Sequence, residues 1–185
     1  MERILACLQD MAPFALAALP LYGLGRWLYI RRRKRSFQRL REIGLALLAV
    51  YGVGLASQTV MTGFQASMDG GGINLIPGKV IADGIRLGLG AGNWHYLTLN
   101  VLGNLLILLP IGFALPLLWR VTPGRAVLIC LGISLAIELC QLFQPRWTDV
   151  DDLILNVFGG WLGACMSQLL LRRFPKCAAI FRAGD

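Results

Sequence analysis

The stretch Glu138–Gly163, ELCQLFQPRWTDVDDLILNVFGGWLG, joins two strongly apolar segments through a short polar connection. It contains four acidic residues, one arginine and several side-chain amides. In a water-soluble domain such a connection would be an ordinary loop. If its flanks cross a membrane, however, these polar groups cost free energy unless they are paired or hydrated. The stretch therefore predicts both a membrane fold and the functional end of the molecule.

The composition also points to lipid as the solvent of this chain. Of its 185 residues, 56% are hydrophobic and only 15% are charged, and the mean hydropathy is +0.63. A soluble domain usually carries about a quarter charged residues. Because the chain has too little polar surface to cover a core in water, we predict a single integral membrane domain of the all-α class, a polytopic helix bundle.

The net charge of +8 does not indicate nucleic-acid binding, because of where the charges lie. Seven of the eighteen basic residues lie between Arg31 and Arg41, and four more lie between Arg172 and Arg182. Both clusters border hydrophobic segments, where positive charge sets the topology of a membrane protein. We therefore expect a membrane and not a nucleic acid as the partner of the basic surface.

Hydropathy predicts five membrane spans and one shorter helix. A span needs about 20 helical residues to cross the hydrocarbon core. The segment after Pro77 is too short to cross, and it places Lys79, Asp83 and Arg86 at helical spacing, so we predict an interfacial amphipathic helix. The predicted spans are about 11–30, 43–61, 97–119, 126–143 and 153–171.

These segments divide the chain into three parts. Residues 1–68 would hold the first two spans with a basic loop, residues 69–171 the outer loop and three further spans, and residues 172–185 a basic tail. Gly159 and Gly163 form a GxxxG pair, which is typical of a helix-packing face.

The basic residues also predict the orientation. The segments 31–41, 120–125 and 172–182 hold 13 of the 18 basic residues, whereas the loops 62–98 and 144–152 hold three. Because cytoplasmic loops carry the excess of Lys and Arg, the first group should be cytoplasmic. The N-terminus is then outside, the C-terminus is cytoplasmic, and the polar connection faces outward.

With this topology, polar pairs on three spans meet at one depth. Residues three or four apart share a helix face, and each of the last three spans carries such a pair near its outer end. The connection between the last two spans adds an arginine and an aspartate. The predicted ligand-binding residues are Asn100, Asn104, Glu138, Gln141, Arg146, Asp149, Asp152 and Asn156.

Several chemical roles are open to this set. Arg146 suits a phosphate or carboxylate, and Glu138 is a candidate acid or base if it is partly desolvated. Asp149, Asp151 and Asp152 are candidate ligands for a hard divalent cation, but their spacing is not specific, so we predict no metal or cofactor. In the structural alternative, the amides hold helices together and Glu138 pairs with Arg146.

At these positions the chain resembles the VanZ-like family of small bacterial membrane proteins. The resemblance covers about residues 70–165 and departs from the family at Gly78, where phenylalanine is expected. It rests on the NLIP run Asn74–Pro77, on Asn100-x-x-x-Asn104 with Pro110-x-Gly112, on Glu138-x-x-Gln141, and on Arg146-x-x-Asp149-Val150-Asp151-Asp152 followed by Asn156, Gly159 and Gly163.

The resemblance implies a function in the bacterial cell envelope and a location in the inner membrane. The namesake of the family is associated with low-level teicoplanin resistance, but other members have no resistance role. We therefore expect recognition of an envelope lipid, a peptidoglycan precursor or a lipoglycopeptide, with a role in antibiotic resistance left open.

Two alternatives remain, and the sequence favours neither. One is a hydrolase or transferase acting on a lipid-linked pyrophosphate, although the sequence leans against an enzyme. The other is a structural partner of other envelope membrane proteins.

Overall fold

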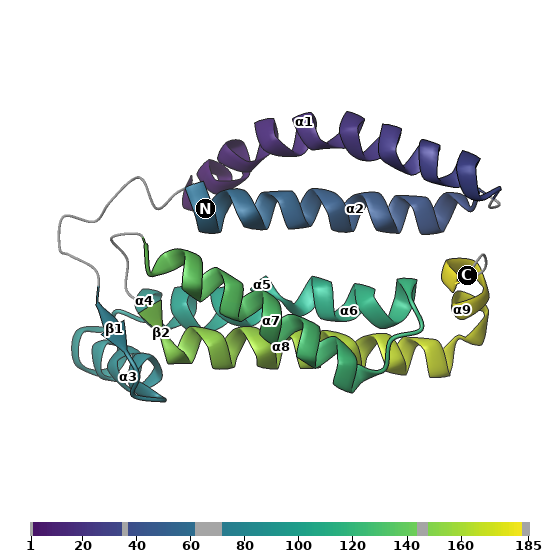
Figure 1. The fold of residues 1–185 in the computed structure, drawn as a ribbon. Coiled ribbons are helices and arrows are strands. Elements are labelled where there is room, and N and C mark those ends of the chain that lie inside the picture. Colours follow the sequence, from purple (N-terminus) through teal and green to yellow (C-terminus); the bar gives the residue numbers. More distant parts are fainter. Residues whose placement is uncertain (1, 35–36, 62–71, 144–147, 183–185) are drawn as a thin grey trace.

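The computed structural model describes residues 2–34, 37–61, 72–143 and 148–182 as a bundle of helices with two very short strands (Figure 1). The all-α class predicted from the sequence is confirmed. In chain order the elements are α1 (Glu2–Arg33), α2 (Arg39–Ala56), the π-helical turn η1 (Ser57–Met61), β1 (Ile73–Asn74), α3 (Lys79–Ala91), α4 (His95–Leu97), the π-helical turn η3 (Thr98–Leu102), α5 (Gly103–Ile107), α6 (Leu109–Leu118), α7 (Pro123–Gln141), β2 (Thr148–Asp149), α8 (Val150–Arg173) and α9 (Pro175–Arg182).

Among the described residues, four helical segments are long and apolar enough to cross a membrane: 39–59, 95–118, 123–141 and 150–173. Only 22–39% of each is buried inside the protein. The exposed remainder is rich in large apolar side chains, including Leu47, Leu128 and Leu169. The predicted first span is helical as part of α1, but α1 is not among these four. The count of five spans therefore stays a prediction.

Helix α1 arches over α2 (Figure 1). Pro13 and Pro20 lie inside α1, and a proline within a helix removes one backbone hydrogen bond and bends the helix. A two-pronged ion pair joins the helices, with Arg26 Nε 2.6 Å from Glu42 Oε2 and Arg26 Nη2 2.9 Å from Glu42 Oε1.

The third predicted span is interrupted at Leu108, between α5 and α6. Pro110 explains the interruption, because it has no N–H to donate to the preceding turn and its ring crowds that turn. The Tyr51 hydroxyl, on α2, donates to the Ile107 carbonyl beside the break at 2.7 Å. Leu108 itself is fully buried in the core cluster with Ile111 and Cys130.

Helix α8 is the central element of the bundle and packs most extensively against α6 and α7. Glycines allow this close approach. A Cβ added to Gly159 would lie 1.8 Å from the Leu105 carbonyl oxygen, and one added to Gly163 would lie 2.1 Å from that of Leu109. From the opposite side, a Cβ on Gly112 would lie 2.0 Å from the carbonyl oxygen of Gly160. The packing role predicted for the GxxxG pair is confirmed.

Two short elements lie at the end of the bundle where α8 begins. Figure 1 shows β1, β2 and α3 there, whereas the α1–α2 connection and α9 lie at the opposite end. Helix α3 packs on α4 through Gly84 and Gly88, next to Leu97 and Trp94. Ile81, Ile85 and Leu89 are exposed on α3 at helical spacing. This apolar stripe supports the interfacial location of α3, which stays a prediction.

The close contact of α8 can be tested with one methyl group. We expect Gly159→Ala to destabilise the protein by about 1–3 kcal/mol, the usual cost of overpacking, because the new Cβ meets backbone that cannot rotate away. Thermal unfolding in detergent would measure the change. Gly132→Ala on α7 is the control, since its Cβ would meet nothing within 4 Å. Equal midpoints for the two variants would contradict the proposed contact.

Candidate functional site

The beginning of α8 is joined to the long loop by a pair of two-residue strands. β1 and β2 are parallel, with Ile73 opposite Thr148 and Asn74 opposite Asp149. The Thr148 N–H donates to the Gly72 carbonyl at 2.9 Å, which extends the ladder by one bond. The ladder therefore places the NLIP segment directly beside the aspartates of the last connection.

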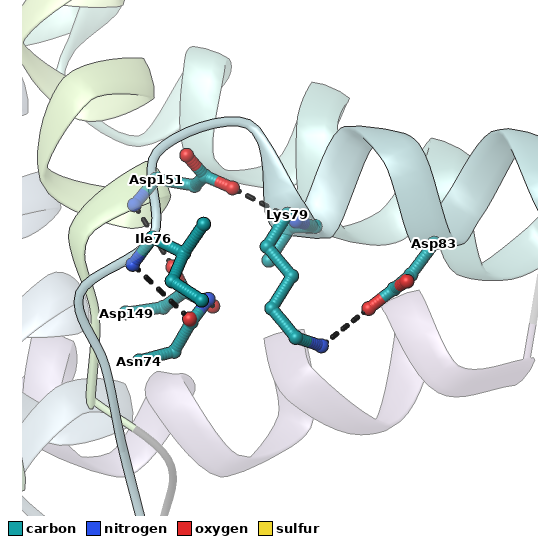
Figure 2. A network of polar contacts seen from close by, with 7 residues as sticks. Asn74, Ile76, Lys79, Asp83, Asp149 and Asp151 are labelled. Atoms are coloured by element: carbon teal, nitrogen blue, oxygen red, sulfur yellow. Dashed lines mark hydrogen bonds and ion pairs between the residues drawn. The ribbon is translucent and has the colours of Figure 1, made fainter.

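Asp149 is the N-cap of α8. Its Oδ1 accepts the Asp151 N–H at 2.9 Å, and its Oδ2 accepts the Asn74 side-chain amide at 2.9 Å. The Asn74 Oδ1 in turn accepts the Ile76 N–H at 3.2 Å (Figure 2). An aspartate at the N-cap satisfies an otherwise unpaired N–H and interacts favourably with the helix dipole. Asp149 therefore has a structural role in addition to any role in binding.

Asp151 caps a different helix from its own. Its Oδ1 accepts the Gly78 N–H at 2.5 Å, and its Oδ2 accepts the Val80 N–H at 2.8 Å, so one carboxylate binds two donors at the start of α3. The side chain is only 3% exposed. Gly78 has φ +81°, which glycine adopts readily and other residues rarely do. This gives a physical reason for glycine where the sequence pattern predicted phenylalanine.

An ion pair follows on the exposed side of α3. Lys79 Nζ lies 2.5 Å from Asp83 Oδ2 (Figure 2). This hydrogen bond holds the pKa of the Asp83 carboxyl below its usual value and raises the pKa of the Lys79 ammonium. The two charges therefore neutralise each other at neutral pH, one turn from the buried Asp151 contact.

Asn104 and Asp152 meet across α5 and α8, as the polar pairs predicted. The Asn104 side-chain amide donates to Asp152 Oδ1, and both residues are partly buried. Asn100 behaves differently, because its side-chain amide donates to the Tyr96 carbonyl within its own helical segment at 2.8 Å. Of the two asparagines on this span, only Asn104 has a described side-chain bond to another helix.

A polar strip runs along the contact of α7 with α8, consisting of Ser134, Glu138, Gln141 and Asn156. These residues are 0%, 8%, 6% and 2% exposed, respectively. The Asn156 side-chain amide donates to Ser134 Oγ at 3.1 Å. The sequence analysis missed Ser134, although its position one turn before Glu138 could have indicated it. The strip is buried in a bundle whose outer faces are apolar.

The end of the second span also approaches α7, which the sequence analysis did not predict. The turn η1 contacts α7, and its Ser57 and Thr59 are buried. Their hydroxyls donate to the backbone carbonyls of Gly54 and Leu55. π-helical turns inside α-helices are frequent at functional sites. The polar run Ser57-Gln58-Thr59 at the end of an apolar span was the available signal.

The aspartates proposed as metal ligands do not form a cluster in the part of the chain that the structure describes. Both oxygens of Asp149 and both of Asp151 accept hydrogen bonds from N–H groups, and Asp152 bonds to Asn104. Carboxylates occupied in this way would have to break these bonds to bind a cation. Arg146, and with it the proposed Glu138–Arg146 pair, lies outside the described residues.

The structural role of Asp151 leads to a direct test. Asp151→Asn should weaken the docking of α3 by about 1–3 kcal/mol, because the amide retains one acceptor and leaves one buried N–H unpaired. Hydrogen exchange over residues 72–91 would then become faster. Asp83→Asn is the control on the same helix, with an exposed ion pair. Unchanged exchange in Asp151→Asn would contradict the capping role.

Comparison with known proteins produced one finding. A model of the VanZ/LLP1 protein family matches residues 42–171, which include every described residue of the site. No curated protein sequence and no solved structure matches the chain.

Proposed function

This chain belongs to the VanZ/LLP1 family, and from this membership and the geometry of the site we propose that it recognises an amphiphile of the bacterial envelope. The ligand classes are an envelope lipid, a peptidoglycan precursor and a lipoglycopeptide. The head of the ligand would bind where α5, α7 and α8 meet, and its acyl chain would lie along the exposed apolar helix faces.

The observation that carries the proposal is the polar strip of Ser134, Glu138, Gln141 and Asn156. Asn156 is 98% buried, and its Oδ1 has no hydrogen-bond partner among the described residues. A buried acceptor without a donor costs about 1–3 kcal/mol. A ligand that supplies an N–H or O–H at this position would recover that free energy, which favours binding there.

The charges of the described residues favour a particular head group. Glu138, Asp152 and the Asn156 Oδ1 are hydrogen-bond acceptors, and the neighbouring Lys79 is already paired with Asp83. Such a site suits hydroxyl, amide or ammonium groups, which sugars and peptides carry. In this proposal Asn100, Asn104 and Gln141 supply further hydrogen bonds, and Arg146 and Asp149 bind the outer part of the head. An anionic group would be recognised through Arg146.

The site would face away from the cytoplasm. The basic residues Arg31–Lys34 and Arg172–Arg173 flank the end of the bundle opposite to the site (Figure 1). Because basic residues favour the cytoplasmic side, the proposed topology has the N-terminus outside and the C-terminus inside, in the bacterial inner membrane. A role in teicoplanin resistance would follow only if the ligand is a lipoglycopeptide.

The topology has a simple test. We expect green fluorescent protein fused after Asp185 to fluoresce, and alkaline phosphatase fused at the same point to be inactive, because the C-terminus is cytoplasmic. Fusions at the N-terminus should give the opposite pattern. Active phosphatase at the C-terminus would contradict the outward-facing site.

Two other functions were open from the sequence. A metal-dependent hydrolase or transferase would need Asp149, Asp151 or Asp152 as cation ligands, but their described oxygens are bound as set out above. A purely structural role is favoured by one observation, the direct Asn156–Ser134 hydrogen bond between α8 and α7. These two functions and ligand recognition differ in what a titration would detect.

The ligand-binding test is a thermal-shift titration of the full-length protein in detergent. The probes are an undecaprenyl-linked peptidoglycan precursor, phosphatidylethanolamine and teicoplanin. We expect one of them to stabilise the wild type by about 2.7 kcal/mol at a concentration of 100 times Kd. Glu138→Gln should lose most of this shift, because it removes the buried charge with little change in shape. Asp83→Asn makes the same chemical change on the surface of α3 and should keep the shift.

Two results would overturn the proposal. One is the absence of any shift in the wild type combined with a large loss of stability in Glu138→Gln, which indicates a structural role. The other is an equal shift in Glu138→Gln and Asp83→Asn, which would locate binding elsewhere.

A further inference from the structure

A second candidate site lies between α1 and α2, next to their basic connection. A cavity of about 740 Å³ is enclosed there by apolar side chains, among them Leu19, Trp27 and Phe37. Helix α1 precedes the residues that match the family. This cavity is therefore independent of the polar strip and of the function proposed for it.

The polar groups of the cavity wall differ in what they leave available. Arg26 and Glu42 neutralise each other through two short contacts. Arg39 is exposed at the edge of the cavity and makes no ion pair among the described residues. Deeper in the wall, the Tyr22 hydroxyl is buried and has no hydrogen-bond partner in the described part of the chain. The wall thus offers one free cation and one free buried hydroxyl.

We propose that this cavity binds an anionic phospholipid. An acyl chain would lie against the apolar wall, the phosphate would bind Arg39, and the Tyr22 hydroxyl would donate to an ester carbonyl of the lipid. A buried hydroxyl gains free energy from such a bond, because it replaces an unmade one. The volume matches that of sites that enclose drug-sized ligands, about 300–1,000 Å³.

Charge complementarity selects an anionic lipid over a neutral one. The basic residues Arg31, Arg32 and Arg33 end α1 beside the cavity, and Arg31 stacks over the Trp27 ring with its guanidinium 5.2 Å from the ring centroid. Each basic residue near an anionic surface contributes about 1 kcal/mol. A zwitterionic lipid would bring an ammonium group into this basic region and lose that contribution.

The test is competition between two lipids in the full-length protein. Purified protein would be incubated with equal amounts of phosphatidylglycerol and phosphatidylcholine of identical acyl chains, and bound lipid would be counted by native mass spectrometry. We expect wild type to retain phosphatidylglycerol about fivefold better, the ratio that corresponds to about 1 kcal/mol. Arg39→Gln should abolish the preference. Arg173→Gln makes the same change of charge on α8 and should keep it.

A second variant tests the cavity itself. Gly23 lines the cavity, and a Cβ there would meet nothing within 4 Å. We therefore expect Gly23→Leu to fold and to reduce retention of both lipids by occupying the space of the acyl chain. Gly25→Leu is the control on the same helix, also with open space at Cβ but outside this cavity.

Three results would overturn the proposal. They are equal retention of the two lipids by wild type, equal loss of preference in Arg39→Gln and Arg173→Gln, and unchanged lipid retention in Gly23→Leu. The first indicates nonselective lipid contact, the second indicates general surface charge, and the third locates the lipid outside the cavity.

Discussion

The close contact of α8 with α5 and α6 is the constraint on which the rest of the bundle depends. Gly159 and Gly163 place the backbone of α8 against the carbonyl groups of Leu105 and Leu109, with no room for a methyl group. In lipid the hydrophobic effect does not drive helices together, so close packing of small residues has to supply much of the association free energy. The same contact fixes the rotation of α8 about its axis and its depth along the bundle.

Once α8 is placed, its polar residues have only one direction to face. Asn156 lies against Ser134 on α7, Asp152 lies against Asn104, and the first turn presents Asp149 and Asp151 to the long loop. The acids at this helix end therefore divide into two groups. Asp149 and Asp151 hold the loop and α3 in place, whereas Glu138 and Asp152 border the buried strip where we propose that the ligand binds.

The two ends of the molecule differ in charge and in chemistry. One end is rich in hydrogen-bond acceptors and carries the short parallel ladder, and the other carries the arginines that end α1 and α8. The α1–α2 cavity lies at the basic end, in a part of the chain that precedes most of the family match. A head group with many donors at one end and a phosphate at the other would each meet complementary charge.

Local properties of the sequence were sufficient to predict the membrane fold, the helical class, the family and the helix faces that carry Asn104, Glu138, Gln141, Asp152 and Asn156. Hydropathy and helical spacing depend only on neighbours in the chain, so one sequence reveals them. Hydrogen-bond partners depend on how helices rotate and shift against each other, and no local pattern contains that information. Only the tertiary structure therefore decided that Asp151 caps α3, that Asn100 bonds within its own helical segment, and that Ser134 belongs to the strip.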